Sequence, residues 1–243
     1  MNVLTIILFG LVSLVTHFIE GITGFGSTVL ALPFAIMLAG VKIGVPVLAV
    51  HTWILALYVI IIDFKNIVWK EFIKIAALVG LGMPLGMWLF TNLPEGILKK
   101  ILGVFMIGVA LRDLCKSFGK DKQQKPLNKY LLDFMLFLGG IIHGAFASGG
   151  PFIIIYSTRA LPDKSNFRAT MCTLWFTLNS FIIFKNVQGG IMTGGAIKLM
   201  LWTIPFLIAG MLLGNFAHHN IKDTLFTKIV NIVLLLSGVF MFL

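Results

Sequence analysis

Long apolar runs alternate with short polar stretches along the whole chain. Six runs of about twenty residues are each long enough to cross about 30 Å of hydrocarbon as an α-helix. They cover 43–62, 72–90, 97–114, 167–184, 195–214 and 225–243. This pattern predicts an all-α integral membrane protein.

Two further apolar runs are interrupted by glycine-rich stretches. The first break separates 4–19 from 27–39, and the second separates 130–142 from 150–158. A glycine costs about 1 kcal/mol relative to alanine in a helix interior. Irregular backbone at membrane depth is tolerated only where it is buried in protein or lines a wet cavity. We therefore expect two broken helices, whose pieces of about 8–16 residues have the length of half-helices.

The polar stretch 115–129 divides the chain into two membrane repeats, 1–114 and 130–243. Leu85–Glu95 aligns with Leu213–Asp223, and Glu20-Gly21 corresponds to His143-Gly144 at a slightly smaller offset. A single duplicated unit accounts for both similarities. Each pseudo-symmetric repeat would hold one broken or re-entrant segment and three transmembrane helices.

The positions of the cations bear on the topology of the broken segments. If both are re-entrant hairpins, fourteen of the 19 Lys and Arg residues lie on one side of the membrane. If both cross, the division is eleven against eight. The positive-inside rule favours the hairpins, which make the repeats inverted and put the linker in the cytoplasm and both termini outside. Full crossing remains the alternative.

Composition excludes a soluble protein. Hydrophobic residues make up 58% of the chain, charged residues 12%, and the mean hydropathy is +1.01. The net charge of +10 is spread between the apolar runs, so it indicates loop bias and no nucleic-acid partner. The N-terminus has no basic region or cleavage site, and we interpret it as the first membrane segment.

The two breaks also suggest chemistry. A helix N-terminus carries unpaired N–H groups and a partial positive charge, so two such ends that face each other would hold an anion. Glycine lets a ligand approach the backbone, and serine or threonine can cap a helix or bind directly. The alternative is that the glycines only allow close helix packing. The candidate substrate-binding residues at the breaks are Thr23, Gly24, Phe25, Gly26, Ser27, Thr28, Ala147, Ser148, Gly149 and Gly150.

Three more residues are candidates outside the breaks. Arg168 opens the run after the second break, and its guanidinium is suited to an anion. Its alternative role is to reach the lipid headgroups. Thr52 and Thr173 are polar positions in apolar runs that bind either substrate or a neighbouring helix.

Ionisable residues inside a membrane run are costly and indicate function. Glu20 precedes the first break, His143 takes the same place at the second, and His17 lies one turn before Glu20. These three are the candidates for proton coupling. The alternative is that they form polar pairs that brace the broken helices.

No other chemistry is indicated. His218 and His219 point apart on a helix, Cys115 and Cys172 match no metal spacing, and no nucleophile–base set or nucleotide loop is present. The sequence therefore predicts no catalytic residues, no metal and no cofactor.

Three motifs stand out together: Gly21-x-x-Gly24-x-Gly26-Ser27 with Pro33, Ser148-Gly149-Gly150-Pro151 with Tyr156, and Phe167-Arg168-Ala169-Thr170 with Asn179. In these motifs the chain resembles the sulfite exporter TauE/SafE family, also called the toluene-sulfonate uptake permeases. Two details depart from the usual family motifs: Gly26-Ser27 replaces a run of three glycines, and Pro151-Phe152 replaces two prolines. The resemblance covers essentially the whole chain.

This resemblance implies a permease of the bacterial inner membrane that moves sulfite, thiosulfate or sulfonates. Together with the breaks, it leads to the hypothesis of a secondary transporter that holds a small sulfur-containing anion at the midplane, in contact with the lipid bilayer. A passive anion channel and an intramembrane enzyme are the alternatives. Direction, coupling ion and oligomeric state stay open.

Overall fold

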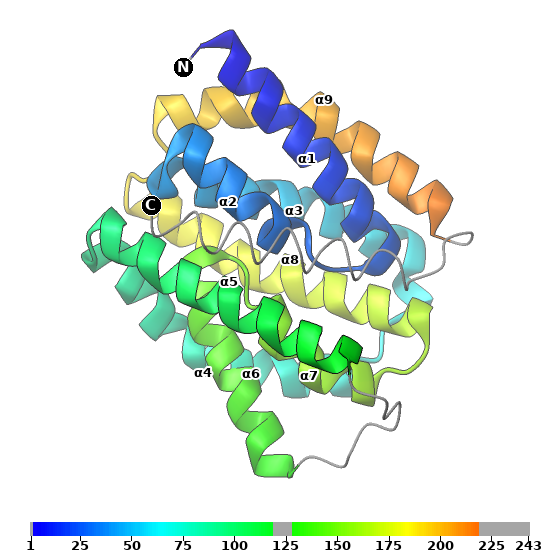
Figure 1. The fold of residues 1–243 in the computed structure, drawn as a ribbon. Coiled ribbons are helices and arrows are strands. Elements are labelled where there is room, and N and C mark those ends of the chain that lie inside the picture. The colour runs from blue at the N-terminus through cyan, green and yellow to red at the C-terminus, as the bar shows by residue number, and fades with distance from the viewer. Residues whose placement is uncertain (1, 119–127, 219–243) are drawn as a thin grey trace.

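The computed structural model describes residues 2–118 and 128–218. Most of the predicted linker and the last apolar run, 225–243, therefore lie outside the described residues. The described part consists of α-helices with one short 3-10 helix (Figure 1). In chain order these are α1 (Val3–Thr23), α2 (Ser27–Ala39), α3 (Val41–Asp63), η1 (Phe64–Asn66), α4 (Trp69–Asn92), α5 (Glu95–Phe118), α6 (Lys129–Phe146), α7 (Gly150–Ala160), α8 (Lys164–Gln188) and α9 (Gly194–Ala217).

Six of the described helices are long and apolar enough to cross a membrane, namely α1, α3, α4, α6, α8 and α9. The prediction of an all-α membrane protein is confirmed. The predicted lengths of the broken pieces were wrong for the first arms, because α1 has 21 residues and α6 has 18. Only α2 and α7, with 13 and 11 residues, are short. Both first arms continue as helix through the polar and glycine positions at which the apolar runs stop.

Close helix pairs join the two halves of the chain. α1 lies beside α9 in the same direction, with Gly10 against Phe206 and Gly21 against Gly214. α4 lies beside α6, also in the same direction, since Gly140 meets Val79 and Gly144 meets Met83. At these contacts glycine lets one backbone touch the other, as small residues do between membrane helices.

α3 and α8 form the central pair and run in opposite directions. Trp53 Nε1 donates to Ser180 Oγ over 2.8 Å, and Asp63 at the end of α3 meets Arg168 near the start of α8. These two helices correspond in the proposed repeats, so their antiparallel packing is compatible with inverted repeats. The inversion and the division at 115–129 stay predictions.

At each break the second piece folds back on the first. α7 packs along α6, where Gly139 lies against Ile153 and Phe152. α2 packs against α1 and turns back along it (Figure 1). Both arrangements are helical hairpins, and their entry and exit on the same side of the membrane stays a prediction.

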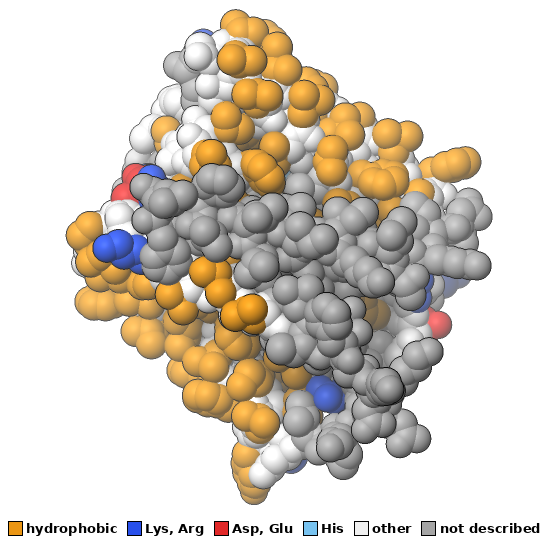
Figure 2. Space-filling model, viewed as in Figure 1, with side chains coloured by type: hydrophobic (Ala, Val, Ile, Leu, Met, Phe, Trp, Pro, Cys, Tyr) orange, Lys and Arg blue, Asp and Glu red, His pale blue; other side chains and the backbone are white. Residues whose placement is uncertain are grey.

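Much of the outer surface is apolar. Hydrophobic side chains gather over α1 and α9 at the top of Figure 2. Trp202 on α9 is 61% exposed and Phe216 is 80% exposed. A contiguous apolar surface of this kind is typical of helices that face lipid.

We expect Gly86→Ala on α4 to destabilise the fold, because a Cβ there would overlap the carbonyl oxygen of Ile141 on α6. Such overpacking costs about 1–3 kcal/mol. Gly80→Ala on the same helix is the control, since a Cβ there meets nothing within 4 Å. Thermal unfolding in detergent measures both variants. Equal midpoints would show that the α4–α6 contact does not require glycine.

Candidate functional site

The first break is a three-residue turn between α1 and α2. Gly24 and Gly26 both adopt left-handed backbone, with φ of 81° and 103°. Gly24 also has no room for a side chain, because a Cβ there would lie 2.7 Å from the Cα of Arg168. A glycine is therefore required at Gly24 both by its dihedral angle and by the close approach of α8.

The second break lies between α6 and α7. Here Ala147, with φ of 52°, takes the left-handed position, and α7 begins at Gly150 with Pro151 in its first turn. Proline fits this position because the first turn of a helix has no use for its missing N–H. Gly149 is needed for packing, since a Cβ there would overlap the carbonyl oxygen of Gly139 on α6.

Both breaks line the same small cavity. Its volume is about 20 Å³, which is room for about one water molecule. It lies halfway along the central helices, because Thr52 is the twelfth of the 23 residues of α3 and Trp175 the twelfth of the 25 residues of α8. The lining residues are Glu20, Gly26, Thr28, Val29, Thr52, His143, Ala147, Ser148, Gly150 and Trp175.

The side of the cavity formed by the first break carries hydroxyl groups and one carboxyl group. Thr52 Oγ1 lies 2.9 Å from Thr28 Oγ1 and 3.2 Å from Ser27 Oγ. The hydroxyl of Ser27 donates to the Glu20 carboxylate. Glu20, which is 1% exposed, thereby joins the last turn of α1 to the first residue of α2.

The side formed by the second break carries an imidazole, an indole and a hydroxyl. The His143 ring stacks on Trp175 with centroids 5.4 Å apart, and its Nδ1 accepts the N–H of Gly149 over 3.4 Å. In the described part of the chain, Ser148 Oγ is buried without a hydrogen-bond partner. The side-chain amide of Asn179 is placed to pair with the His143 ring. Buried hydroxyl groups are normally paired, so Ser148 has a donor to spare for a ligand.

Comparisons with known proteins identify the family of this chain. A family model described as sulfite exporter TauE/SafE matches residues 9–241. The chain belongs to this family. It is also similar to the probable inner membrane transporter protein TsaS of Comamonas testosteroni, with 22% identity over 178 residues that make up 73% of each chain. No solved structure matches. The protein is thus a multi-pass membrane transporter of the TauE/SafE class.

For this family member, the structure brings together eight of the residues singled out in the sequence. These line the cavity directly: Gly26, Thr28, Thr52, Ala147, Ser148, Gly150, Glu20 and His143. Ser27 contacts two of them through its hydroxyl, and the backbone N–H of Gly149 contacts one.

Other candidates lie beside the cavity. The carbonyl of Gly24 accepts a 3.0 Å hydrogen bond from Trp175 Nε1, and the ring of Phe25 packs edge-on against Phe167. The hydroxyl of Thr23 donates to Phe25 O over 2.7 Å. These contacts hold the first break against α8.

Arg168 and Thr173 are bonded elsewhere. The Arg168 guanidinium, 2% exposed, pairs with Asp63 at 3.2 Å and donates to Asn215 Oδ1 over 2.8 Å. Arg168 therefore connects α8 to α3 and α9, which neither alternative in the sequence analysis foresaw. The hydroxyl of Thr173 donates to the carbonyl of Ala169 within α8.

His17 belongs to a separate buried cluster. Its Nδ1 donates to the carbonyl of Ser13 over 2.8 Å, and its ring lies 5.7 Å from that of His51. His51 in turn contacts Ser13 Oγ at 3.0 Å and Thr203 Oγ1 at 3.1 Å. This cluster joins α1, α3 and α9, and it does not line the cavity.

Sequence reasoning missed Trp175 and Val29. For Trp175 a signal was present, because it follows Thr52 by the same offset of 123 residues that separates His143 from Glu20. Within residues 2–118 and 128–218, no group of three His, Cys, Asp or Glu side chains is placed to hold a metal ion.

We expect Arg168→Ala to lower stability strongly, because it leaves Asp63 without its partner in a largely buried place. Removing one member of a buried ion pair costs about 3–5 kcal/mol. Arg168→Ala combined with Asp63→Asn should unfold at a higher temperature than Arg168→Ala alone. A double-mutant cycle on thermal unfolding measures this coupling. Strictly additive effects would mean that the pair contributes nothing to the fold.

Proposed function

We propose that this protein is a secondary transporter that carries a small sulfur-containing anion, of the sulfite, thiosulfate or sulfonate class, through the cavity between the two breaks. One observation carries the proposal: two helix starts and the unpartnered hydroxyl group of Ser148 meet in one buried cavity at mid-height. The family and the name of the TsaS relative support the transporter class.

The donors for the anion come mainly from the ends of α2 and α7. Each helix start offers backbone N–H groups and the positive end of its dipole. The glycines Gly26 and Gly150 let the ligand reach this backbone, and the Ser148 hydroxyl adds a donor. Among the described residues, no Lys or Arg lines the cavity, so the anion would be held by neutral donors and could leave again.

The size of the cavity favours a carrier over a passive channel. A volume of about 20 Å³ holds one water but no anion of four or more heavy atoms. The two hairpins must therefore separate to load the anion. Motion of one repeat against the other around a fixed midplane site, as in other secondary transporters, provides this opening.

Glu20 gives the carrier a means of coupling to protons. A carboxylate and an anion in the same dry cavity repel each other, so binding of the anion favours protonation of Glu20. The bond from Ser27 holds the carboxyl group at the start of α2, where the anion is expected. His143 occupies the corresponding place at the second break and is the second candidate. His17 would act only through the polar cluster on α1, α3 and α9.

Transport itself is tested by uptake of labelled sulfite, thiosulfate and a simple sulfonate into proteoliposomes, with and without a pH gradient. We expect saturable uptake of at least one anion, which is recovered chemically unchanged. Electrical conductance without saturation would instead indicate a channel, and a new chemical product would indicate an enzyme.

Ser148→Ala should weaken binding of the transported anion by about tenfold or more, because a hydrogen bond to a charged group contributes about 1.5–3 kcal/mol. Ser157→Ala is the matched control on α7, since that buried hydroxyl donates to Ile153 O and lies outside the cavity. The concentration dependence of uptake measures both. An equal loss of anion affinity in the two variants would show that Ser148 does not bind the anion.

Glu20→Gln should abolish the dependence of uptake on the pH gradient and leave anion binding intact. The amide keeps the shape of the side chain but does not bind or release a proton in the accessible pH range. Glu95→Gln is the control, because Glu95 lies outside the cavity lining and pairs with Lys99 at 3.4 Å. Coupling that survives in Glu20→Gln would rule out this carboxyl group as the coupling site.

A further inference from the structure

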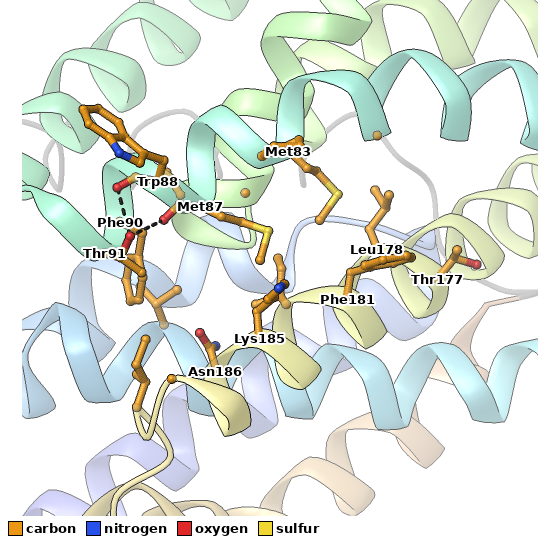
Figure 3. A pocket seen from close by; sticks show the side chains of 18 of the residues that line it. Met83, Met87, Trp88, Phe90, Thr91, Thr177, Leu178, Phe181, Lys185 and Asn186 are labelled. Atoms are coloured by element: carbon orange, nitrogen blue, oxygen red, sulfur yellow. Dashed lines mark hydrogen bonds between the residues drawn. The ribbon is translucent and has the colours of Figure 1, made fainter.

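A second, much larger cavity lies between α4 and α8. Its volume is about 860 Å³, and its walls are mostly apolar (Figure 3). Met83 and Met87 of α4 and Leu178 and Phe181 of α8 line it. Methionine suits such a place, because its flexible thioether adapts to ligands of irregular shape.

The rim of the cavity on α4 and α8 also carries exposed apolar side chains. Trp88 at its edge on α4 is 57% exposed, and Phe181 on α8 is 64% exposed. In a membrane transporter, such exposed aromatic side chains on spanning helices face lipid. The cavity is therefore placed to receive a molecule from the bilayer.

Two lysines lie at one end of this cavity. Lys42 is the second residue of α3, and Lys185 lies in the last turn of α8. Thr91, near the end of α4, lines the same end. These residues stand at the ends of three helices that are long enough to span a membrane, and such ends are expected at the depth of the lipid headgroups.

The ammonium groups are available to a ligand. Lys42 Nζ donates to the carbonyl of Phe90 and lies 4.5 Å from the centre of its ring. An ammonium group has three N–H donors, so Lys42 can still reach a further acceptor, although the Glu95 carboxylate is close enough to attract it. The nearby carboxylate of Glu95 pairs with Lys99 and accepts the N–H of Val41. Lys185 is exposed, and Figure 3 shows its side chain among those that line the cavity.

We propose that this cavity is a binding site for an anionic phospholipid. An acyl chain would lie between α4 and α8, and the phosphate would bind Lys42 and Lys185. Basic pockets between membrane helices bind anionic headgroups in this way. A small hydrated anion is a poorer occupant, because it would lose water against apolar walls without replacement hydrogen bonds.

The floor of the cavity connects it to the second break. Gly144 and Ala145 of α6 line it, and they directly follow His143 of the central cavity. Gly144 also contacts Met83, which lines this larger cavity. A lipid in this place would therefore press on the helix end that must move during transport. This effect on transport, unlike the binding itself, rests on the proposed function.

Binding is tested on the full-length protein by native mass spectrometry after reconstitution in mixtures of phosphatidylglycerol and phosphatidylcholine. We expect preferential retention of phosphatidylglycerol, lowered about fivefold in Lys185→Gln. Lys198→Gln is the control, because Lys198 is an exposed lysine near the start of α9 that does not line the cavity. Equal retention of the two lipids, or equal losses in the two variants, would overturn the proposal.

A second measurement locates the lipid. The fluorescence of Trp88 and of Trp202 is each obtained as the difference between the wild type and the variant Trp88→Phe or Trp202→Phe. Phosphatidylglycerol with brominated acyl chains should quench the Trp88 fluorescence more strongly than the Trp202 fluorescence. Equal quenching would mean that the lipid covers the protein without a preferred place, or that another segment fills the cavity, and would overturn the site.

The regulatory effect is measured separately, as anion uptake against phosphatidylglycerol content. We expect uptake by the wild type to rise with this lipid and uptake by Lys185→Gln to depend on it less. Absence of any uptake would contradict the proposed function, and the lipid retention would still decide the binding site. Uptake that ignores lipid composition would contradict the coupling alone.

Discussion

The structure depends on how two interrupted helices are held together inside an apolar environment. A break frees backbone N–H and C=O groups, and in lipid each unpaired group costs several kcal/mol. At each break a side chain forms a hydrogen bond from one helix piece to the other. The hydroxyl of Ser27 donates to Glu20 at the first break, and the N–H of Gly149 donates to His143 at the second. Trp175 adds a bond from α8 to the carbonyl of Gly24. These bonds keep the two turns facing one cavity.

Close packing around the breaks imposes the second constraint. α9 packs against α1 of the first hairpin, and α4 packs against α6 of the second, in both cases through glycine. Each hairpin is therefore held by a helix from the other half of the chain. Gly21 and Gly144, which follow the ionisable residues Glu20 and His143, both take part in these contacts. A displacement of either partner helix therefore acts directly on the end of a broken helix. Movement of α9 or α4 is therefore transmitted to the cavity through a single helix contact.

Local features of the sequence predicted the positions of the breaks well. Gly24 and Gly26 are needed for left-handed backbone, and that requirement is visible in the residue type itself. The second turn shows the limit of this reasoning, because Ala147 takes the left-handed position there. The lengths of α1 and α6 were underestimated, since Glu20 and His143 looked like the ends of apolar runs when they are buried side chains paired with neighbours.

Contacts between distant residues were out of reach of local patterns. Arg168 was a candidate for the anion because it opens the run after the second break and its guanidinium is suited to an anion. Its partners, Asp63 and Asn215, come from two other helices that only the fold brings close. The His17–Ser13–His51 cluster was hidden for the same reason, since its members lie on α1 and α3.

The two sides of the central cavity are built alike but carry different chemistry. Glu20 and His143 stand in corresponding places, as do Thr52 and Trp175. The first break thus offers a carboxyl group and hydroxyls, and the second an imidazole, an indole and an unpartnered serine. If the two halves arose by duplication, as the sequence predicts, the same scaffold supplies both helix starts, and the different side chains on each side give them different roles. Among the described residues that line the cavity, the acid is on the first side. An anion bound as we propose would therefore be repelled from the first break and attracted by the donors of the second, unless a proton accompanies it.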